Sequence, residues 1–386
     1  ECVDEDSDWW CDGLDCADTD SAIHPGAPEI DDDNIDNDCD GETDEANTED
    51  LDLDGDGWTP AEGDCLDVGD GAEFVNPDAV EDLGPDGLGD EVDNDCDGAT
   101  DEPCACSPDT GQSMSAMDCA AEFGCNPQFV VSQGAMSSPT GDSISNAYFA
   151  VNHFGDVSND LAPRAGGSYA LVATGPATGT SHSSDLSGGG TASDPYSTDG
   201  YATHDNVEYS IQLKAPVNAM GFSINYVFFS AEYDEFVGSS FNDKFYILMN
   251  APTTTGGSWQ VINYTDCRGS YYDFTSPDCL NNHCCYIAIN TALSECCWYE
   301  GCPDGTWTTS ISGTGFSCAA SSGSDSSAYG SSTGWLVTTW NIEPGEEFTL
   351  KFHVHDTSDG IYDSEVLLDN FKWETTPVEP GTNPVE

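Results

Sequence analysis

Basic residues are almost absent from this chain of 386 residues. Lys and Arg together number 6 against 73 Asp and Glu, and the formal net charge at pH 7 is −67. Proteins that bind nucleic acid use Lys and Arg to neutralise phosphates, so this composition excludes nucleic acid as a partner. Hydrophobic residues still make up 37% of the chain, which is enough for a folded core, and the length suits two or three domains of about 150 residues each.

Long apolar runs and a catalytic motif in a suitable setting are also missing. No segment approaches the ~18 to 20 consecutive apolar residues that a membrane-spanning helix requires, and we therefore expect no membrane span. Residues 330–334 match the G-x-S-x-G motif of serine hydrolases, but they lie in a run of Ser and Gly without the strand that positions such a nucleophile. We expect no enzymatic activity.

Cysteine, in contrast, is abundant, and the 18 Cys are spaced for disulfides rather than in the repeated C-x-x-C pairs of metal fingers. Disulfides form in oxidising compartments, which predicts an extracellular or cell-surface protein. The sequence begins at Glu1 without Met or a cationic and apolar leader, as expected after cleavage of a signal peptide. In the acidic region described below, Cys16 with Cys39 and Cys65 with Cys96 are the expected pairs, each contributing roughly 3 kcal/mol.

The remaining cysteines fall into three groups. Cys2 and Cys11 lie near the N-terminus, Cys104, Cys106, Cys119 and Cys125 lie at a junction between two regions, and eight lie between residues 267 and 318. The last group predicts an insertion stapled by disulfides. A zinc cluster is the alternative there, although His283 is the only imidazole nearby.

Acidic residues are concentrated at the N-terminal end. Residues 1–103 hold 40 of the 73 acids and no Lys or Arg, and the first basic residue is Arg164. Two carboxylates about 4 Å apart repel by roughly 4 kcal/mol at an effective dielectric constant near 20. A compact module of this composition therefore needs bound cations. A halophilic origin would also favour acids over Lys, but it would not explain their spacing.

The spacing shows a duplicated unit. The six residues D-N-D-C-D-G at positions 36–41 return 57 positions later at 93–98, and each copy is followed by Asp-Glu. Asp15-Cys16 also has a second copy, Asp64-Cys65, 49 positions later. We therefore expect two repeats, over residues 1–48 and 49–103.

Each repeat contains a loop with the chemistry of calcium coordination. Carboxylates at positions 1, 3 and 5 of D-x-D-x-D-G converge on one cation, and the Gly permits the sharp turn. In the second copy these positions are residues 52–57, Asp64 is the expected closing acid, and Pro60 argues against the flanking helix of an EF-hand. The predicted ligands of several Ca²⁺ ions are Asp4, Asp6, Asp8, Asp15, Asp36, Asp38, Asp40, Asp44, Glu45, Asp52, Asp54, Asp56, Asp64, Asp93, Asp95, Asp97, Asp101 and Glu102. A merely solvated acidic face is the alternative.

Together these elements resemble the "putative metal-binding motif" repeats of bacterial extracellular proteins, which run D-x-D-x-D-G, D-C, P-G-A-x-E and D-N-D-C-D-G-x-x-D-E. Residues 25–29 and 76–81 fill the third element. The resemblance also implies copper as a ligand, because one branch of that family binds it. Copper prefers His or thiolate, whereas the hard oxygen ligands here favour Ca²⁺.

From about residue 126 apolar and polar residues alternate between Gly, Ser and Thr loops, which is typical of β-strands. Strands are expected at 129–132, 148–152, 169–174, 207–213, 219–229, 244–250, 259–264, 286–290, 335–342, 348–355 and 365–373. Eleven short strands without a convincing helix predict a mainly β domain, a jelly roll or β-sandwich. In residues 348–355 the apolar side chains mark the core face, and Lys351, His353 and His355 are expected in solvent, with metal binding by the two His as the alternative.

Two stretches of this region, residues 227–243 and 356–364, resemble the hallmark segments of the choice-of-anchor L domain of bacterial surface and secreted proteins. The resemblance covers most of residues 126–375 and implies a β-sandwich without a defined activity. Glu232, Asp243, Asp356 and Asp363 lie in these stretches at strand ends, so both sets are expected to meet at one edge of the sandwich. They predict a further Ca²⁺ site, and acids that cap turns in solvent are the alternative. Asn263 begins an N-glycosylation sequon.

We therefore predict a secreted, calcium-stabilised bacterial surface structural protein. Its expected parts are the disulfide-stapled repeats 1–103, a Cys-containing junction 104–125, a β-sandwich 126–375 with the insertion 267–318, and a Pro-rich tail 376–386. An extended tail adds a strand to the sheet of the next subunit in this hypothesis, and such head-to-tail contacts build a homopolymeric filament or matrix. The alternatives are a copper-binding surface protein and a calcium-dependent adhesin that stacks cell-surface glycans on Trp298, Tyr299 or Trp307.

Overall fold

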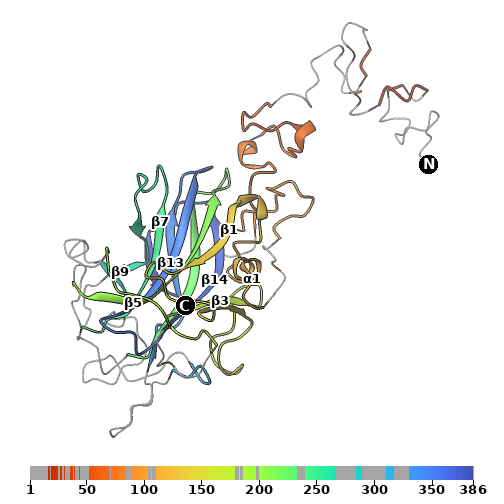
Figure 1. The fold of residues 1–386 in the computed structure, drawn as a ribbon. Helices are drawn as coiled ribbons and strands as arrows, with labels where there is room; N and C mark the ends of the chain where they lie inside the picture. Colours follow the sequence, from red (N-terminus) through yellow and green to blue (C-terminus); the bar gives the residue numbers. More distant parts are fainter. Residues whose placement is uncertain are drawn as a thin grey trace. The chain divides into compact units, whose positions relative to one another are not determined.

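The chain folds into two compact units, residues 1–81 with 91–101 and residues 82–90 with 102–386. The structure is a computed structural model. It describes residues 52–69, 71–83, 89–102, 110–178, 186–196, 200–232, 240–266, 284–288, 310–316 and 330–385, with Cys106, His182 and scattered positions between 16 and 43. All the strands labelled in Figure 1 belong to the second unit. None of the helices in the described part of the chain has the length and apolar character needed to cross a bilayer.

In its described residues the first unit consists mostly of loops, and short 3₁₀ helices lie at Pro60–Glu62 and Ala72–Phe74. The predicted disulfides Cys16–Cys39 and Cys65–Cys96 are both confirmed. A few small apolar side chains are buried, so cross-links and polar contacts must replace a large core here.

The described positions of the two repeats have the same backbone contacts. His24 N–H donates to the carbonyl of Asn37 at 3.0 Å, and Asn76 N–H donates to the carbonyl of Asn94 at 2.9 Å. Three residues further on, each repeat buries an Ala whose N–H bonds back to His24 or Asn76 at 2.9 Å. The sequence duplication is therefore also a structural one.

The second unit contains two antiparallel sheets. The first is ordered β1 (Val130–Ser137), β5 (Ala202–Lys214), β13 (Glu347–Thr357), β7 (Lys244–Asn250), β10 (Cys284–Ala288) and β9 (Tyr264–Asp266), with β4 (Ala192–Ser193) beside β5 and β8 (Gln260–Val261) beside β7. The second is ordered β15 (Gly381–Pro384), β12 (Leu336–Asn341), β6 (Gly221–Ser230), β14 (Ser364–Glu374), β3 (Tyr169–Ala173) and β2 (Tyr148–Val151), with β11 (Ser331–Ser332) beside β6. The mainly β class is confirmed, and jelly-roll connectivity stays a prediction.

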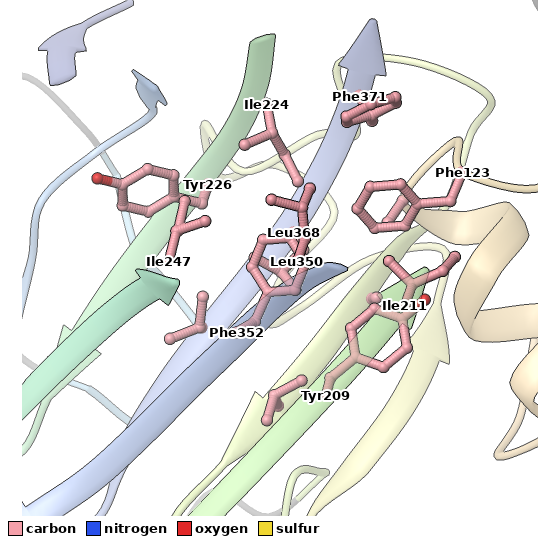
Figure 2. Packing of buried hydrophobic residues seen from close by; sticks show 14 of the residues in the cluster. Phe123, Tyr209, Ile211, Ile224, Tyr226, Ile247, Leu350, Phe352, Leu368 and Phe371 are labelled. Carbon is pink, nitrogen blue, oxygen red and sulfur yellow. The ribbon is translucent and has the colours of Figure 1, made fainter. Parts of the chain in front are cut away.

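Alternation along the strands builds the core. Phe348, Leu350, Phe352 and Val354 of β13 all join one buried cluster with residues of the second sheet. Figure 2 shows side chains from both sheets in this core, among them Phe352 of β13 and Leu368 of β14. Each buried aliphatic or aromatic side chain contributes roughly 1.5 to 3 kcal/mol. Strand β6 is buried along its whole length because its other face packs into a second cluster that includes Phe229.

Three features differ from the predicted elements. A short helix, α1 (Met114–Ala120), lies in the segment interpreted as a Cys junction; the Ser113 hydroxyl caps it, and the disulfide Cys106–Cys119 fixes it. The strand expected over 259–264 is split into β8 and β9. The reason is the fully buried Asn263, whose Oδ1 accepts from Ile247 N–H at 2.7 Å and whose Nδ2 donates to the Phe245 carbonyl at 3.0 Å. Because this side chain is buried, the sequon that Asn263 begins is not accessible for glycosylation in the folded chain.

The third difference concerns the tail. Residues 381–384 form β15 and pair with β12 of the same chain, with Thr382 opposite Thr338. The hydroxyls of these two residues lie 2.7 Å apart in a buried contact. The structure thus places the tail strand on the chain's own sheet, not on a neighbour's.

Candidate metal centres

The loop 52–58 folds around its own carboxylates. Asp52 accepts hydrogen bonds from the N–H groups of Gly55 at 2.6 Å and Gly57 at 3.0 Å. Asp54 accepts from Asp56 N–H at 3.0 Å, and Asp56 accepts from Trp58 N–H at 2.7 Å. Gly55 and Gly57 have φ values of 86° and 100°, a left-handed conformation that other residues rarely adopt. The D-x-D-x-D-G pattern is therefore needed for the loop conformation as well as for charge.

This loop brings acidic side chains into two overlapping triads. Asp54 lies with Asp52 and Asp67 in one triad and with Asp56 and Asp64 in the other, and within each triad the carboxylate oxygens are less than 4.8 Å apart. Ca²⁺ binds oxygen ligands at about 2.3 to 2.6 Å. Two oxygens bound to the same ion are therefore at most about 5 Å apart, which is close to the separation within each triad. Each triad has the dimensions of a partial calcium shell.

The end of the second repeat repeats the arrangement. Asp93 accepts from Gly98 N–H at 3.0 Å, as Asp52 does from Gly57. One triad contains Glu81, Asp93 and Asp95, and another contains Asp95, Asp97 and Glu102. These triads consist only of carboxylates, which are hard oxygen donors.

Burial makes three of these carboxylates, Asp54, Asp64 and Asp95, more difficult to ionise than exposed carboxylates. Burial, followed by neighbouring carboxylates, raises the pKa of Asp54 and Asp64 above its ordinary value. The same causes raise the pKa of Asp95, with Asp97 as the largest charged contributor. Residues 1–103 contain no Lys or Arg that could supply a counter-charge.

Sequence reasoning missed two members of these triads. Asp67 and Glu81 were not among the predicted ligands, yet each completes a triad. The signal was present in the duplication, since Asp18 and Glu29 occupy the corresponding places in the first repeat. Glu81 also accepts from Asn94 N–H at 2.8 Å, and this bond fixes the loop that it joins.

Not every predicted ligand joins a triad. The carboxylate of Asp101 accepts from Glu91 N–H at 3.1 Å and lies outside the four triads. Asp36 is half-buried and also lies outside them. Asp4, Asp6, Asp8, Asp15, Asp38, Asp40, Asp44 and Glu45 lie outside the described residues, as do the predicted glycan platforms Trp298, Tyr299 and Trp307.

The four acids predicted at an edge of the sandwich lie within the domain. Glu232, Asp243, Asp356 and Asp363, here called the inter-sheet acidic cluster, are each at most 2% exposed. Burial, followed by the charge of Asp243, raises the pKa of Glu232 to about 11, and burial raises that of Asp243 to about 6. The alternative that these acids cap turns in solvent is therefore wrong for these four side chains.

The outer face of β13 also differs from the expectation. His355 is fully buried and His353 nearly so, although alternation predicted that both would face solvent. His353 Nδ1 lies 3.1 Å from Glu208, and its Nε2 lies 3.0 Å from His355 Nδ1. Burial, together with His353 and Lys244, lowers the pKa of His355 well below its usual value. These imidazoles belong to a buried polar network that also includes Asp194, directly after β4, whose carboxylate lies 3.7 Å from His355 Nε2.

Comparison with known protein families gives two matches. The model of the choice-of-anchor L domain matches residues 167–372. The model described as "putative metal-binding motif" matches residues 15–45 and 70–102, and the second range contains the triads formed by Glu81 to Glu102. No curated protein is similar enough in sequence to match the chain.

Proposed function

Because the chain belongs to the choice-of-anchor L domain family and also carries metal-binding motifs, it is a protein of the surface or extracellular type, and we propose that its role is structural and calcium-dependent. In this proposal the two acidic repeats fold around Ca²⁺ and form the N-terminal module, and the β-sandwich is the larger unit. The protein is not an enzyme in this proposal.

The observation that carries the proposal is the set of four carboxylate triads in a region without basic residues. Packing these side chains within 4.8 Å of one another brings like charges together, and no cationic side chain of the repeats offsets the repulsion. A divalent cation supplies the missing positive charge. Calcium suits the triads better than copper, because copper prefers imidazole or thiolate ligands and the triads contain only carboxylates.

Substitution of the shared ligand tests the proposal. Asp54 belongs to two triads, so Asp54→Asn is expected to remove at least one bound Ca²⁺ per chain and to lower the thermal midpoint of the repeats in calcium. The exposed Glu73 lies in the same repeat outside the triads, and Glu73→Gln is the matched control with unchanged stoichiometry. Bound metal is counted by elemental analysis after dialysis against calcium and copper together. Copper retained in place of calcium, or equal metal contents in the two variants, would contradict the proposal.

Self-assembly is a finer version of the same proposal. Copies would join head to tail if the tail strand left its own sheet and paired with β12 of a neighbouring copy. The pairing of β15 with β12 involves only four residues of β15. Exchange of this strand between chains therefore breaks few contacts, and pairing with the neighbouring β12 restores most of them. The chain would then be the subunit of an extracellular filament or matrix.

A further inference from the structure

We propose that the β-sandwich binds a Ca²⁺ ion of its own between its two sheets, with Glu232, Asp243 and Asp356 as ligands. This site is separate from the triads of the repeats and does not depend on them. It lies beyond the part of the chain that the metal-binding motif matches, which ends at residue 102.

Strand alternation places two of these ligands in the space between the sheets. On β13, the side chains of Phe352 and Val354 belong to the inter-sheet core, and Asp356 follows two residues later on the same face. On the neighbouring strand β7, Phe245 belongs to the same core, and Asp243 precedes it by two residues. Both carboxylates therefore continue the inward-facing rows of the core at one end of the sandwich.

The second sheet supplies hydroxyl groups to the same place. Asp243 Oδ2 accepts from Ser364 Oγ of β14 at 2.8 Å and from Ser230 Oγ of β6 at 3.3 Å. Its other oxygen accepts from Thr357 N–H at 2.9 Å. Glu232 lies two residues after Ser230, and its N–H donates to the Ser230 hydroxyl at 3.2 Å. Asp243 is thus held in a fixed position between the sheets and brings the groups of both sheets together.

The surroundings of the Asp356 carboxylate indicate that a cation binds beside it. Asp356 is 1% exposed, and neither of its carboxylate oxygens accepts a hydrogen bond of ordinary geometry from the described residues, although the Thr174 side chain lies close enough to lower its pKa. Oxygen Oε2 of Glu232, which is 2% exposed, is also without a partner there. A buried ionised carboxylate without a partner costs several kcal/mol, so both groups require either a proton or a cation.

The charges around Asp356 favour a cation. The charged groups that act most strongly on Asp356 are Asp243, Asp363 and Asp205, and all three are acidic. Gly175 leaves room for this concentration of carboxylates, since a Cβ atom at that position would lie 2.2 Å from Asp363 Oδ2. Protonation of one acid would relieve only part of the repulsion among four or five carboxyl groups.

The donor atoms select the kind of ion. The described groups placed at the proposed site above are carboxylates, hydroxyls and backbone N–H, and oxygen ligands of this kind suit Ca²⁺. His182 is the imidazole on this side of β14, but its Nδ1 lies 3.1 Å from Glu365 and its Nε2 lies 2.8 Å from the Thr314 carbonyl. Both ring nitrogens are therefore engaged, and a metal that needs nitrogen ligands finds none here.

Two neutral substitutions test the site in the full-length chain. Asp356→Asn and Glu232→Gln are each expected to lower the number of bound Ca²⁺ ions by one, as counted by native mass spectrometry. Asp118→Asn is the matched control, because Asp118 is also buried in this domain but accepts hydrogen bonds from Tyr209 at 2.6 Å and Gly134 N–H at 3.1 Å. The control is expected to retain the wild-type number of ions. Asp54→Asn removes calcium from the repeats alone, so failure of one site is distinguishable from failure of the other.

Stability measurements separate a cation from a shared proton. If the site binds Ca²⁺, Asp356→Asn lowers the thermal midpoint of the sandwich in calcium and raises it in chelator, where the charge is uncompensated. If the acids only share a proton, the substitution shifts the midpoint in the same direction in both buffers and leaves the calcium count unchanged, and the proposal is overturned.

A measurement on the unaltered protein keeps the test decisive where both variants fail to fold. Crystals of the full-length chain are soaked with Tb³⁺, which replaces Ca²⁺ and scatters anomalously. An anomalous peak bonded to the carboxylates of Asp356 and Asp243 is expected. Peaks in the repeats without one between the sheets would overturn the proposal.

Discussion

The protonation of individual carboxyl groups in this protein depends on where the fold buries them. Glu122, directly after α1, lies beside Asp369 of β14, and burial followed by the charge of Asp369 raises the pKa of Glu122 to about 9. The N–H of Asn370 donates to Glu122 at 2.5 Å, and the N–H of Arg164 donates to Asp369 at 2.5 Å. Lys372 acts on Glu122 in the opposite direction but more weakly. Glu122 is therefore protonated at neutral pH in the folded protein.

This protonation makes stability depend on pH. Because the folded pKa of Glu122 is raised above the unfolded value, the folded state holds a proton that the unfolded state releases, and the free energy of unfolding falls as pH rises from about 4.5 towards 9. Between pH 5.5 and 7.5 the expected loss from this residue is about 2.6 kcal/mol. Urea unfolding at the two pH values is expected to show a smaller loss in Glu122→Gln than in the wild type.

A control variant checks the assignment. Hydrogen bonds from Thr254 and Thr253 lower the pKa of Glu346 against the effect of burial, so this residue is ionised in both states throughout that pH range. Glu346→Gln is expected to keep the pH dependence of the wild type. The same pH dependence in Glu122→Gln and the wild type would contradict the account of Glu122.

At the scale of secondary structure, the tail strand is the element on which the proposed self-assembly depends. Removal of residues 376–386 deletes β15, exposes the edge of β12 and leaves the buried Thr338 hydroxyl without Thr382. We expect the truncated chain to unfold at lower temperature and, in millimolar calcium, to form no polymers. A synthetic peptide of residues 376–386 is expected to restore the thermal midpoint by pairing with β12.

Sizing chromatography and electron microscopy of the wild type and the truncated chain check this prediction. Polymers of the wild type that vanish on truncation support exchange of the tail strand. Wild-type protein that stays monomeric at millimolar calcium would contradict self-assembly and leave the calcium-binding role of the repeats intact.

Strands with one apolar and one polar face were predictable from the sequence. Features that depend on contacts with distant parts of the chain were not. The alternation in β13 correctly assigned its apolar face to the core. It assigned His353 and His355 to solvent, because the sequence of one strand does not reveal that Asp194, directly after β4, lies beside His355. Helix α1 has only seven residues, too few for a helical period to be recognised, and its disulfide depends on a pairing that spacing alone leaves open.

Some ligands of the candidate metal sites were likewise predictable from the sequence, and others were not. Asp52, Asp54 and Asp56 were predictable because neighbours in sequence form their loop. Asp67 and Glu81 come from outside that loop, and only comparison of the two repeats would have indicated them. For the inter-sheet acidic cluster the residues were predictable, but their burial between two sheets follows from tertiary packing.

On the scale of the whole molecule, the account requires divalent cations to balance a formal charge of −67 in a folded chain. Two units carry this requirement in different ways. The described residues of the repeats bury few apolar side chains, and the repeats are expected to depend on cations and disulfides, whereas the sandwich has a large core and holds acids within it. Calcium is therefore expected to affect the stability of both units, and the repeats more strongly.

Differential scanning calorimetry of the full-length protein, with and without a calcium chelator, tests this claim most directly. Chelation is expected to abolish the unfolding transition of the repeats and to shift that of the sandwich to lower temperature, and added calcium is expected to reverse both changes. Thermograms that superimpose in calcium and in chelator would contradict the account.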